Sequence, residues 1–342
     1  MQIVKLPKQN LDKFIKSLSK FGQIYAPIKK DANTSLFSKI EDSSQIDLGY
    51  NRTLLPPKKY FLPPIDTMFK FSAEAGYEEM EHDLNEKSIL LGVHSCDIHG
   101  LRILDLVFSG RYVDNYYFTG RKNTSIIGVS CIPDDMCFCR SMGTDFVENG
   151  FDLFLSDIDQ SYLVRIATSL GDDMVRASQS LFKEVGKEEI EEHKKKSNEM
   201  QKHFKIDLEL YNLPEILDLE YESKTWEEIG EKCLSCGSCS MVCPTCYCYD
   251  VFDELSLDGK TGERKRRWDS CLFKDYALVA GGTNFRSERS ARVKNRYFHK
   301  HRGFVAQYGK PSCVGCGRCI QSCPAKINIV EVITKIRSDA YV

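Results

Sequence analysis

The chain has 342 residues, of which 42% are hydrophobic and 28% are charged, and its formal net charge is −2 at pH 7. This composition is typical of a globular protein of two domains and argues against intrinsic disorder. The near-neutral charge, with no recognised nucleic-acid-binding motif, argues against DNA or RNA as a partner. The chain starts without the apolar segment of a secretory signal and has no run of about eighteen apolar residues, so we expect a cytoplasmic protein without a membrane span.

Helical and strand-like patterns alternate in the first part of the chain. The elements expected in chain order are a helix over 9–22, a strand over 88–96, a helix over 97–108, a strand over 125–131, a hairpin over 150–168 and a helix over roughly 173–205. Both single strands are almost continuously apolar, which is typical of buried strands. Strand, helix and strand in this order predict an α/β domain, which we place at residues 1–213.

The second part of the chain is expected to form another domain over residues 214–342, with the boundary near Leu213–Pro214. The sequence TWEE at 225–228 has the capping-box pattern and predicts the start of a short helix. The segment from Arg264 to Arg302 is strongly basic. It is either a solvated surface or a docking face for an acidic partner or an anionic cofactor.

Cysteine is the most informative residue type, because the chain contains 15. The cytoplasm keeps thiols reduced, so we expect metal binding and no disulfide framework. One motif, C-x2-C-x2-C-x3-C-P, occurs twice with identical spacing. Its cysteines are Cys233, Cys236, Cys239 and Cys243 in the first copy and Cys313, Cys316, Cys319 and Cys323 in the second.

This spacing indicates two [4Fe–4S] clusters, because each cubane needs four thiolates and a tight loop with three cysteines supplies most of them. Gly237, Gly315 and Gly317 give the loops the backbone freedom to turn. In two-cluster ferredoxins the fourth cysteine ligates the other cluster, so we expect crossed ligation. The predicted sets are Cys233, Cys236, Cys239 and Cys323 for cluster 1, and Cys313, Cys316, Cys319 and Cys243 for cluster 2. Structural zinc is the alternative, although zinc typically uses two separated C-x2-C pairs.

A long insertion, at about 249–310, separates the two motifs. Cys246 and Cys248 follow the first motif directly, and Cys271 lies inside the insertion. These three cysteines are either buried core thiols or part of a further metal or redox site. Cluster potentials respond to nearby charge, so Arg318, Lys326 and the basic run 286–302 are candidates for raising the potentials.

The N-terminal domain has its own group of cysteines, namely Cys96, Cys131, Cys137 and Cys139. Cys96 and Cys131 each end an apolar strand and are expected to meet at the carboxyl ends of those strands, a common place for cofactors in α/β sheets. The four thiols suit a third [4Fe–4S] cluster. A zinc site and a set of unliganded or redox-active thiols remain alternatives. His94 and Asp97 are ligands, outer donors to a metal site, or structural residues.

Several catalytic signatures are missing from the sequence. It contains no G-x-G-x-x-G after a strand, no P-loop, no nucleophile elbow and no H-E-x-x-H. We therefore name no catalytic residue and expect a chain that carries electrons without a substrate site of its own.

The sequence resembles a known iron–sulfur family. The motifs that carry the resemblance are HSCDIHGLRILD, CFCRSMGTD, CLSCGSCSMVCPTCYCYDVFDE, RRWDSCLF, AGGTNFR, RYFHK and CVGCGRCIQSCP. This family includes the beta subunit of soluble sulfhydrogenases (hydrogenase/sulfur reductase) and the iron–sulfur subunit of the anaerobic sulfite reductase, and the resemblance extends from about Phe61 to Ile333. It implies membership of an anaerobic oxidoreductase complex. The implied partners are a flavin- and NAD(P)H-binding subunit, together with a terminal reductase or hydrogenase subunit.

The residues and the resemblance together predict an α+β protein, in which an N-terminal α/β domain precedes a two-cluster ferredoxin-like domain with a long insertion. The predicted function is electron relay between the flavoprotein and the terminal subunit. One alternative is a thiol-based sulfur or disulfide reductase that acts through the N-terminal cysteines, which would need a thiol of low pKa. The other alternative is a zinc-stapled interaction module.

Overall fold

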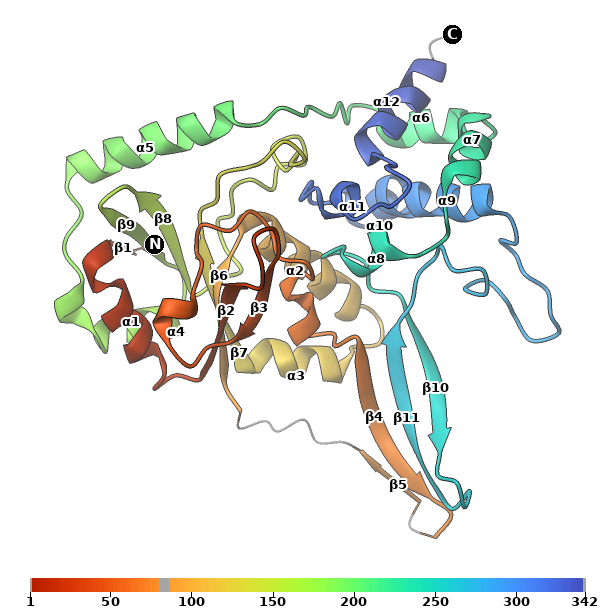
Figure 1. Cartoon of the computed structure of the whole chain (residues 1–342), viewed down its shortest axis with the longest axis horizontal. Coiled ribbons are helices and arrows are strands. Elements are labelled where there is room, and N and C mark those ends of the chain that lie inside the picture. Colours follow the sequence, from red (N-terminus) through yellow and green to blue (C-terminus); the bar gives the residue numbers. More distant parts are fainter. Residues whose placement is uncertain (1, 75, 80–85, 341–342) are drawn as a thin grey trace.

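The chain folds around two β-sheets in the computed structural model, which describes residues 2–74, 76–79 and 86–340 (Figure 1). The strands are β1 (Gln2–Pro7), β2 (Gln23–Lys29), β3 (Ser35–Lys39), β4 (Ile65–Ser72), β5 (Gly76–Glu79), β6 (Ser88–Val93), β7 (Thr124–Val129), β8 (Leu153–Ile158), β9 (Ser161–Ile166), β10 (Tyr249–Leu255) and β11 (Thr261–Trp268). The α-helices are α1 (Leu11–Leu18), α2 (Ser95–Phe108), α3 (Asn115–Asn123), α4 (Ser169–Arg176), α5 (Lys187–Lys202), α6 (Leu213–Leu219), α7 (Thr225–Lys232), α8 (Ser238–Met241), α9 (Arg289–Phe298), α10 (Phe304–Tyr308), α11 (Arg318–Gln321) and α12 (Ile329–Asp339).

The larger sheet has the strand order β1-β9-β8-β7-β6-β2-β3. Its centre is parallel, because β2 pairs with β6, β6 with β7 and β7 with β8 in the same direction. Successive residues of β6 face opposite sides, as in any strand: Leu91 packs with α1 and α4, whereas Leu90 packs with α2 and α3. Helices on both faces of a parallel sheet make the α/β arrangement that the sequence predicts.

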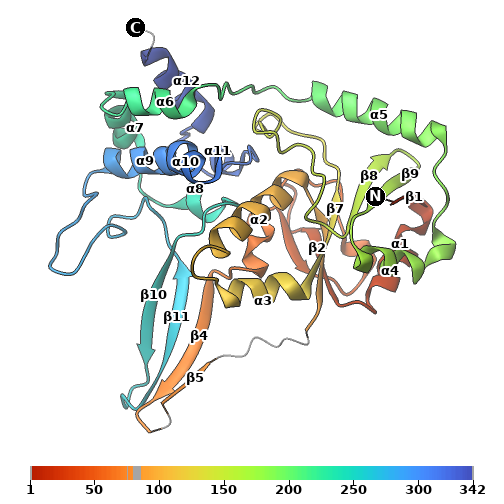
Figure 2. The same ribbon diagram turned by 180° about the vertical axis from the view of Figure 1, so that it is seen from behind.

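The C-terminal region is built from short helices around an apolar core. The aromatic residues Trp226 of α7 and Tyr297 of α9 pack together with Ile333 of α12 in this core. Helix α9 continues through a π-helical turn, His299–Gly303, into α10. Figure 2 shows α9 and α10 in one row, with α6, α7 and α12 on one side of it and α8 on the other.

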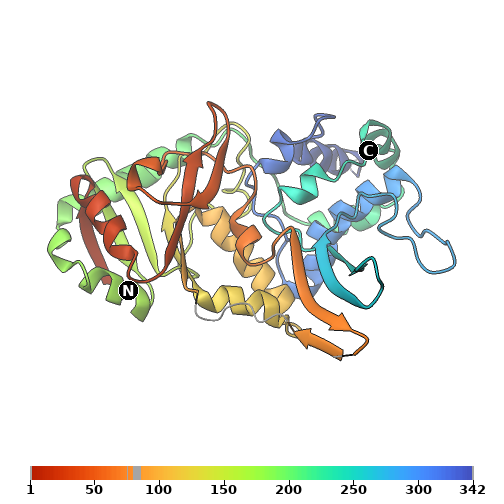
Figure 3. The same cartoon turned by 60° about the horizontal axis from the view of Figure 1, so that its bottom comes forward.

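The smaller sheet joins the N-terminal region of the chain to the C-terminal region. Its order is β10-β11-β4-β5, so two strands of the predicted insertion pair with two strands of the N-terminal region. Figure 3 shows these segments side by side. At their junction the guanidinium of Arg266 is buried and pairs with the carboxylates of Asp66 and Asp114. The division into domains at residue 213 stays a prediction, and this sheet spans it.

Two local predictions need correction. The single helix expected over 173–205 is two helices, α4 and α5, because the chain turns at Gln179–Leu181 and α5 begins only after Gly186. Helix α7 starts where TWEE predicts it, but the capping box is absent: the hydroxyl of Thr225 donates to Asp339 at 2.8 Å. Within the described ranges, no helix has both the length and the apolarity to cross a membrane.

Candidate metal centres

Each C-terminal cysteine motif forms a tight loop that leads into one turn of helix, α8 in the first copy and α11 in the second. Gly237 and Gly317 precede these turns with φ of 71° and 72°, in the left-handed region that favours glycine. At the preceding equivalent position the first copy has Ser235 and the second has Gly315, and both also have positive φ. The two copies therefore share one backbone shape, and α8 contacts α11.

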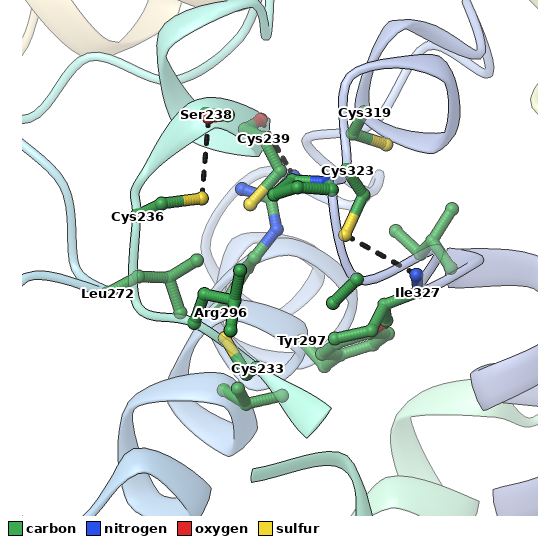
Figure 4. A pocket seen from close by; sticks show the side chains of 15 residues that line it. Cys233, Cys236, Ser238, Cys239, Leu272, Arg296, Tyr297, Cys319, Cys323 and Ile327 are labelled. Carbon is green, nitrogen blue, oxygen red and sulfur yellow. Dashed lines mark hydrogen bonds between the residues drawn. The ribbon is translucent and has the colours of Figure 1, made fainter. Parts of the chain in front are cut away.

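The first predicted set of ligands surrounds a pocket. The lining residues include Cys233, Cys236, Cys239 and Cys323, the crossed set expected for cluster 1, together with Cys319 and Arg296. Figure 4 shows the sulfur atoms of the four predicted ligands directed into this space. Cys236 is exposed and its pKa is lowered by a hydrogen bond with the hydroxyl of Ser238. This set of thiols consequently reaches the protein surface at Cys236, whereas Cys233 is buried.

The second predicted set, Cys243, Cys313, Cys316 and Cys319, is farther inside. Burial raises the pKa of Cys313 to about 11 and raises that of Cys319 further, and both thiols also feel the charge of Cys243. The ammonium of Lys300 lies 3.4 Å from the sulfur of Cys243 and donates to Thr245 and Ser312 at 2.9 Å. The structure brings together both crossed sets, whose role as ligands stays a prediction.

The N-terminal group also comes together at the carboxyl ends of β6 and β7. Cys96 lies in the first turn of α2, and Cys131 follows β7. Cys137 and Cys139 lie in a loop and not in a strand, and their thiols are near that of Cys131. The guanidinium of Arg52 donates to the sulfur of Cys137 at 3.3 Å.

The loop of Cys137 and Cys139 packs directly against the second C-terminal motif. The backbone N–H of Phe138 donates to the carbonyl of Gly315 at 2.8 Å, and the hydroxyl of Thr144 donates to that of Val314 at 2.7 Å. A Cβ atom on Gly315 would lie 2.5 Å from the carbonyl oxygen of Phe138. The N-terminal thiols and the second C-terminal set are therefore neighbours.

Lys300 and Arg296 are buried cations that face the C-terminal thiols; Lys58 is a third, and burial lowers its pKa to about 8. Lys300 and Arg296 are 3% and 6% exposed, and among the described residues no carboxylate forms an ion pair with either. Burial opposes the charge of Arg296, but Cys239 and Cys246 offset it and keep its pKa well above the ordinary value. Burial likewise opposes the charge of Lys300, and Cys243 keeps its pKa high. The surroundings of these cations thus fit anionic thiolates.

The remaining candidates have structural contacts. Asp97 accepts two hydrogen bonds from Arg318, at 2.6 and 2.7 Å, and both side chains are buried. The ring of His94 stacks on that of Tyr50 at 4.1 Å, and burial lowers the pKa of His94 to about 3. Both residues therefore act as structural residues in the contacts that the structure shows.

The three extra cysteines line one small cavity together with Arg296 and Lys300. Cys246 is near both Cys243 and Arg296, Cys248 accepts a hydrogen bond from the hydroxyl of Tyr276 at 3.3 Å, and Cys271 is buried. Over the parts of the chain that the structure describes, no three His, Cys, Asp or Glu side chains converge closely enough to hold one metal ion.

The basic segment is partly exposed and partly buried. Exposed residues of β11 pair with acidic residues of β10, for example Arg264 with Asp253, and a docking role for this surface stays a prediction. The other part of the segment is buried, and Lys300 and Arg296 reach the thiols. Arg292, Arg296 and Lys300 recur every four residues, which puts them on one helical face, and this spacing is the sequence signal that could have revealed them.

Comparison with known proteins agrees with this geometry. Residues 232–327 match the 4Fe-4S dicluster domain family. The chain is 42% identical over 337 residues to sulfhydrogenase 2 subunit beta of Pyrococcus furiosus, and the match covers 98% of this chain and 99% of that protein. No solved structure matches. The resemblance seen in the sequence is confirmed: this α+β chain, with its C-terminal 4Fe-4S dicluster domain, belongs to the family of the sulfhydrogenase beta subunits.

Proposed function

We propose that the chain is the electron-transfer subunit of an anaerobic oxidoreductase, and that it relays electrons between an NAD(P)H-linked flavoprotein and a terminal reductase or hydrogenase subunit. In this proposal the relay requires at least two [4Fe–4S] clusters, which the crossed C-terminal sets bind. A third cluster on Cys96, Cys131, Cys137 and Cys139 completes the relay.

The observation that carries this proposal is the pair of buried cations at the thiols. A buried cation without a counter-charge costs several kcal/mol, so Lys300 and Arg296 need negative charge beside them. Neutral thiols do not supply this charge, whereas thiolates bound to a cluster do. The match of residues 232–327 to a dicluster domain favours iron–sulfur clusters over structural zinc.

The order of the three sets supports a relay. The first set reaches the surface at Cys236, and Cys319 of the second set lines the same pocket as the first set. The N-terminal set packs on the second set through the contact of Phe138 with Gly315. A path from the surface to the N-terminal domain follows from these contacts.

In this proposal the clusters supply one-electron transfer when they are bound. The protein contributes position and electrostatics: the tight loops orient the thiolates, the apolar core around Ile333 excludes water, and Lys300 offsets negative charge at Cys243. The thiol-reductase alternative receives no support, because burial raises the pKa of Cys131 to about 12 and a reactive thiol needs a low pKa.

The test is EPR of the anaerobically purified chain, with and without its flavoprotein partner. We expect NAD(P)H to reduce the clusters only when the flavoprotein is present. In Cys323→Ala one cluster signal should be lost, whereas the matched variant Cys271→Ala should keep all signals. Reduction by NAD(P)H without a flavoprotein, or no reduction with it, would contradict the proposal.

A further inference from the structure

Arg165 of β9 is a buried cation outside the thiol centres. Its side chain is almost completely enclosed, and the residue is 4% exposed. The guanidinium lies against the rings of Phe146 and Phe154, each at 4.6 Å, and Phe151 at 5.1 Å. Its Nη1 donates to the carbonyl of Val147 at 2.9 Å. The aromatic rings and this hydrogen bond fix the plane of the guanidinium.

The edge of this guanidinium formed by Nε and Nη2 has no hydrogen-bond partner among the described residues. Neither Nε nor Nη2 of Arg165 makes a hydrogen bond to any residue in the described parts of the chain, although both atoms are buried. Among the described residues, no carboxylate forms an ion pair with Arg165, and the exposed Glu148 is the only acid that raises its pKa, which burial lowers. Leaving buried donors of a charged group unsatisfied is costly, and each such case in a native protein needs an explanation.

In other arginines of this chain, the edge formed by Nε and Nη2 binds a carboxylate. Nε and Nη2 of Arg121 donate to the two oxygens of Asp105, each at 2.9 Å. Nε and Nη2 of Arg264 hold Asp253 in the same way, each at 2.7 Å. The geometry is the bidentate fork that matches carboxylates and other oxyanions. In Arg165 neither atom of this fork has a hydrogen-bond partner among the described residues.

Arg165 lines a cavity of about 520 Å³ between the sheet and α5. Charged groups of the wall are already paired: Lys8 with Asp157, and Lys196 with both Asp159 and Glu199. The wall also contains Asp145, which accepts a hydrogen bond from Gln201 at 2.7 Å. The acids of the wall thus have partners of their own, and none of them compensates Arg165.

Two further wall residues add to this picture. The buried Nδ1 of His193, on α5, has no hydrogen-bond partner among the described residues. Burial and the charge of Arg165 lower the pKa of His193, which places the imidazole near the guanidinium. Cys131 lines the same cavity, so the space opens toward the N-terminal thiols.

We propose that this cavity binds a small oxyanion, held in bidentate fashion by Nε and Nη2 of Arg165, with Nδ1 of His193 as a second donor. The anion carries either a planar carboxylate or a tetrahedral oxyanion group, since both match the fork. It lies in the cavity that Cys131 lines, where it would contact the N-terminal thiol group. Anion binding at Arg165 requires no iron–sulfur cluster, so its test is independent of the test of the proposed relay.

The test is calorimetric titration of the full-length, anaerobically purified chain with sodium sulfate and, separately, with sodium acetate, at constant ionic strength in chloride. We expect one saturable site. Arg165→Lys keeps the charge but loses the fork and should weaken binding at least fivefold. Arg165→Met should abolish it. The matched control Arg176→Met removes an exposed arginine, which pairs with Asp172, and should bind as the wild type does.

The two anions distinguish the ligand class: tighter binding of acetate identifies a carboxylate site, and tighter binding of sulfate identifies a tetrahedral oxyanion site. Equal affinities of Arg165→Met and the wild type, or the lack of any saturable binding, overturn the proposal. Should Arg165→Met fail to fold, crystals of the wild type soaked in selenate and, separately, in 4-bromobenzoate decide. An anomalous peak beside Nε and Nη2 of Arg165 in either soak supports the site, and no peak there in both soaks refutes it.

Discussion

Replacing Lys300 by methionine keeps most of the aliphatic side chain and removes a buried charge beside the second C-terminal set. The ammonium lies 3.4 Å from the sulfur of Cys243, and the residue is 3% exposed. A positive charge at this place stabilises the reduced, more negative form of a cluster. Lys300→Met should therefore lower the reduction potential of cluster 2.

The size of this shift follows from Coulomb's law. With an effective dielectric constant of about 20, two unit charges at 3.4 Å interact by about 5 kcal/mol. The added electron spreads over the whole cluster, so about a third of this energy, roughly 1.6 kcal/mol, is a reasonable expectation. For a one-electron couple this corresponds to a decrease of about 70 mV.

The assay is an EPR-monitored redox titration of the anaerobic protein. Lys294→Met is the matched control, because its ammonium donates to the carbonyl of Tyr221 at 2.9 Å and contacts no thiol of the described residues. The control should titrate like the wild type. A Lys300→Met potential within about 15 mV of the wild type, or a shift to higher potential, would refute the electrostatic role of Lys300.

Three further predictions follow from the same contacts. Gly315→Ala should lower the free energy of unfolding by more than about 3 kcal/mol, because it adds a clash with Phe138 to the strain of a φ of 63°. The control Gly309→Ala, at a φ of 70° with nothing within 4 Å of the new Cβ, should lower it by only about 1–2 kcal/mol. Thermal unfolding of both variants measures this difference. Cys246→Ala should leave the iron content unchanged and lower the potential of cluster 2 by about 20–40 mV in redox titration, because it removes a weak donor to Cys243; loss of iron would show instead that Cys246 is a ligand. The hydrogen bond with Cys246 and the charge of Lys300 hold the pKa of Cys243 well below that of a free thiol, so Cys243 stays a thiolate when a chelator removes the iron. In the iron-free form Lys300→Met therefore leaves a buried thiolate without its cation and should melt at a lower temperature than the wild type, and an equal or higher melting temperature would contradict this.

Much of the architecture was predictable because it rests on local patterns. The apolar runs of β6 and β7 and the helical pattern of α2 specify buried elements without reference to distant residues. The cysteine spacing likewise predicts two equivalent loops, which the structure contains, whereas the crossed ligation of two clusters stays a prediction. The gathering of Cys96 and Cys131 followed from the shared edge of two parallel strands.

The parts that the sequence did not reveal depend on long-range contacts. Strands β10 and β11 are rich in charge and show no apolar strand pattern, so their pairing with each other and of β11 with β4 was not predictable from the sequence. Lys300 and Arg296 look like surface residues in the sequence. Only the fold shows that thiols lie beside them, and thiolates there offset the cost of burying these cations.

The central claim is that the thiolates of the C-terminal motifs hold two [4Fe–4S] clusters. Its most direct test is the iron and acid-labile sulfide content of the anaerobically purified chain, with zinc measured in the same sample. The account predicts about eight iron and eight sulfide per chain, or about twelve of each with the N-terminal cluster. A colourless protein that contains zinc and no sulfide would contradict it.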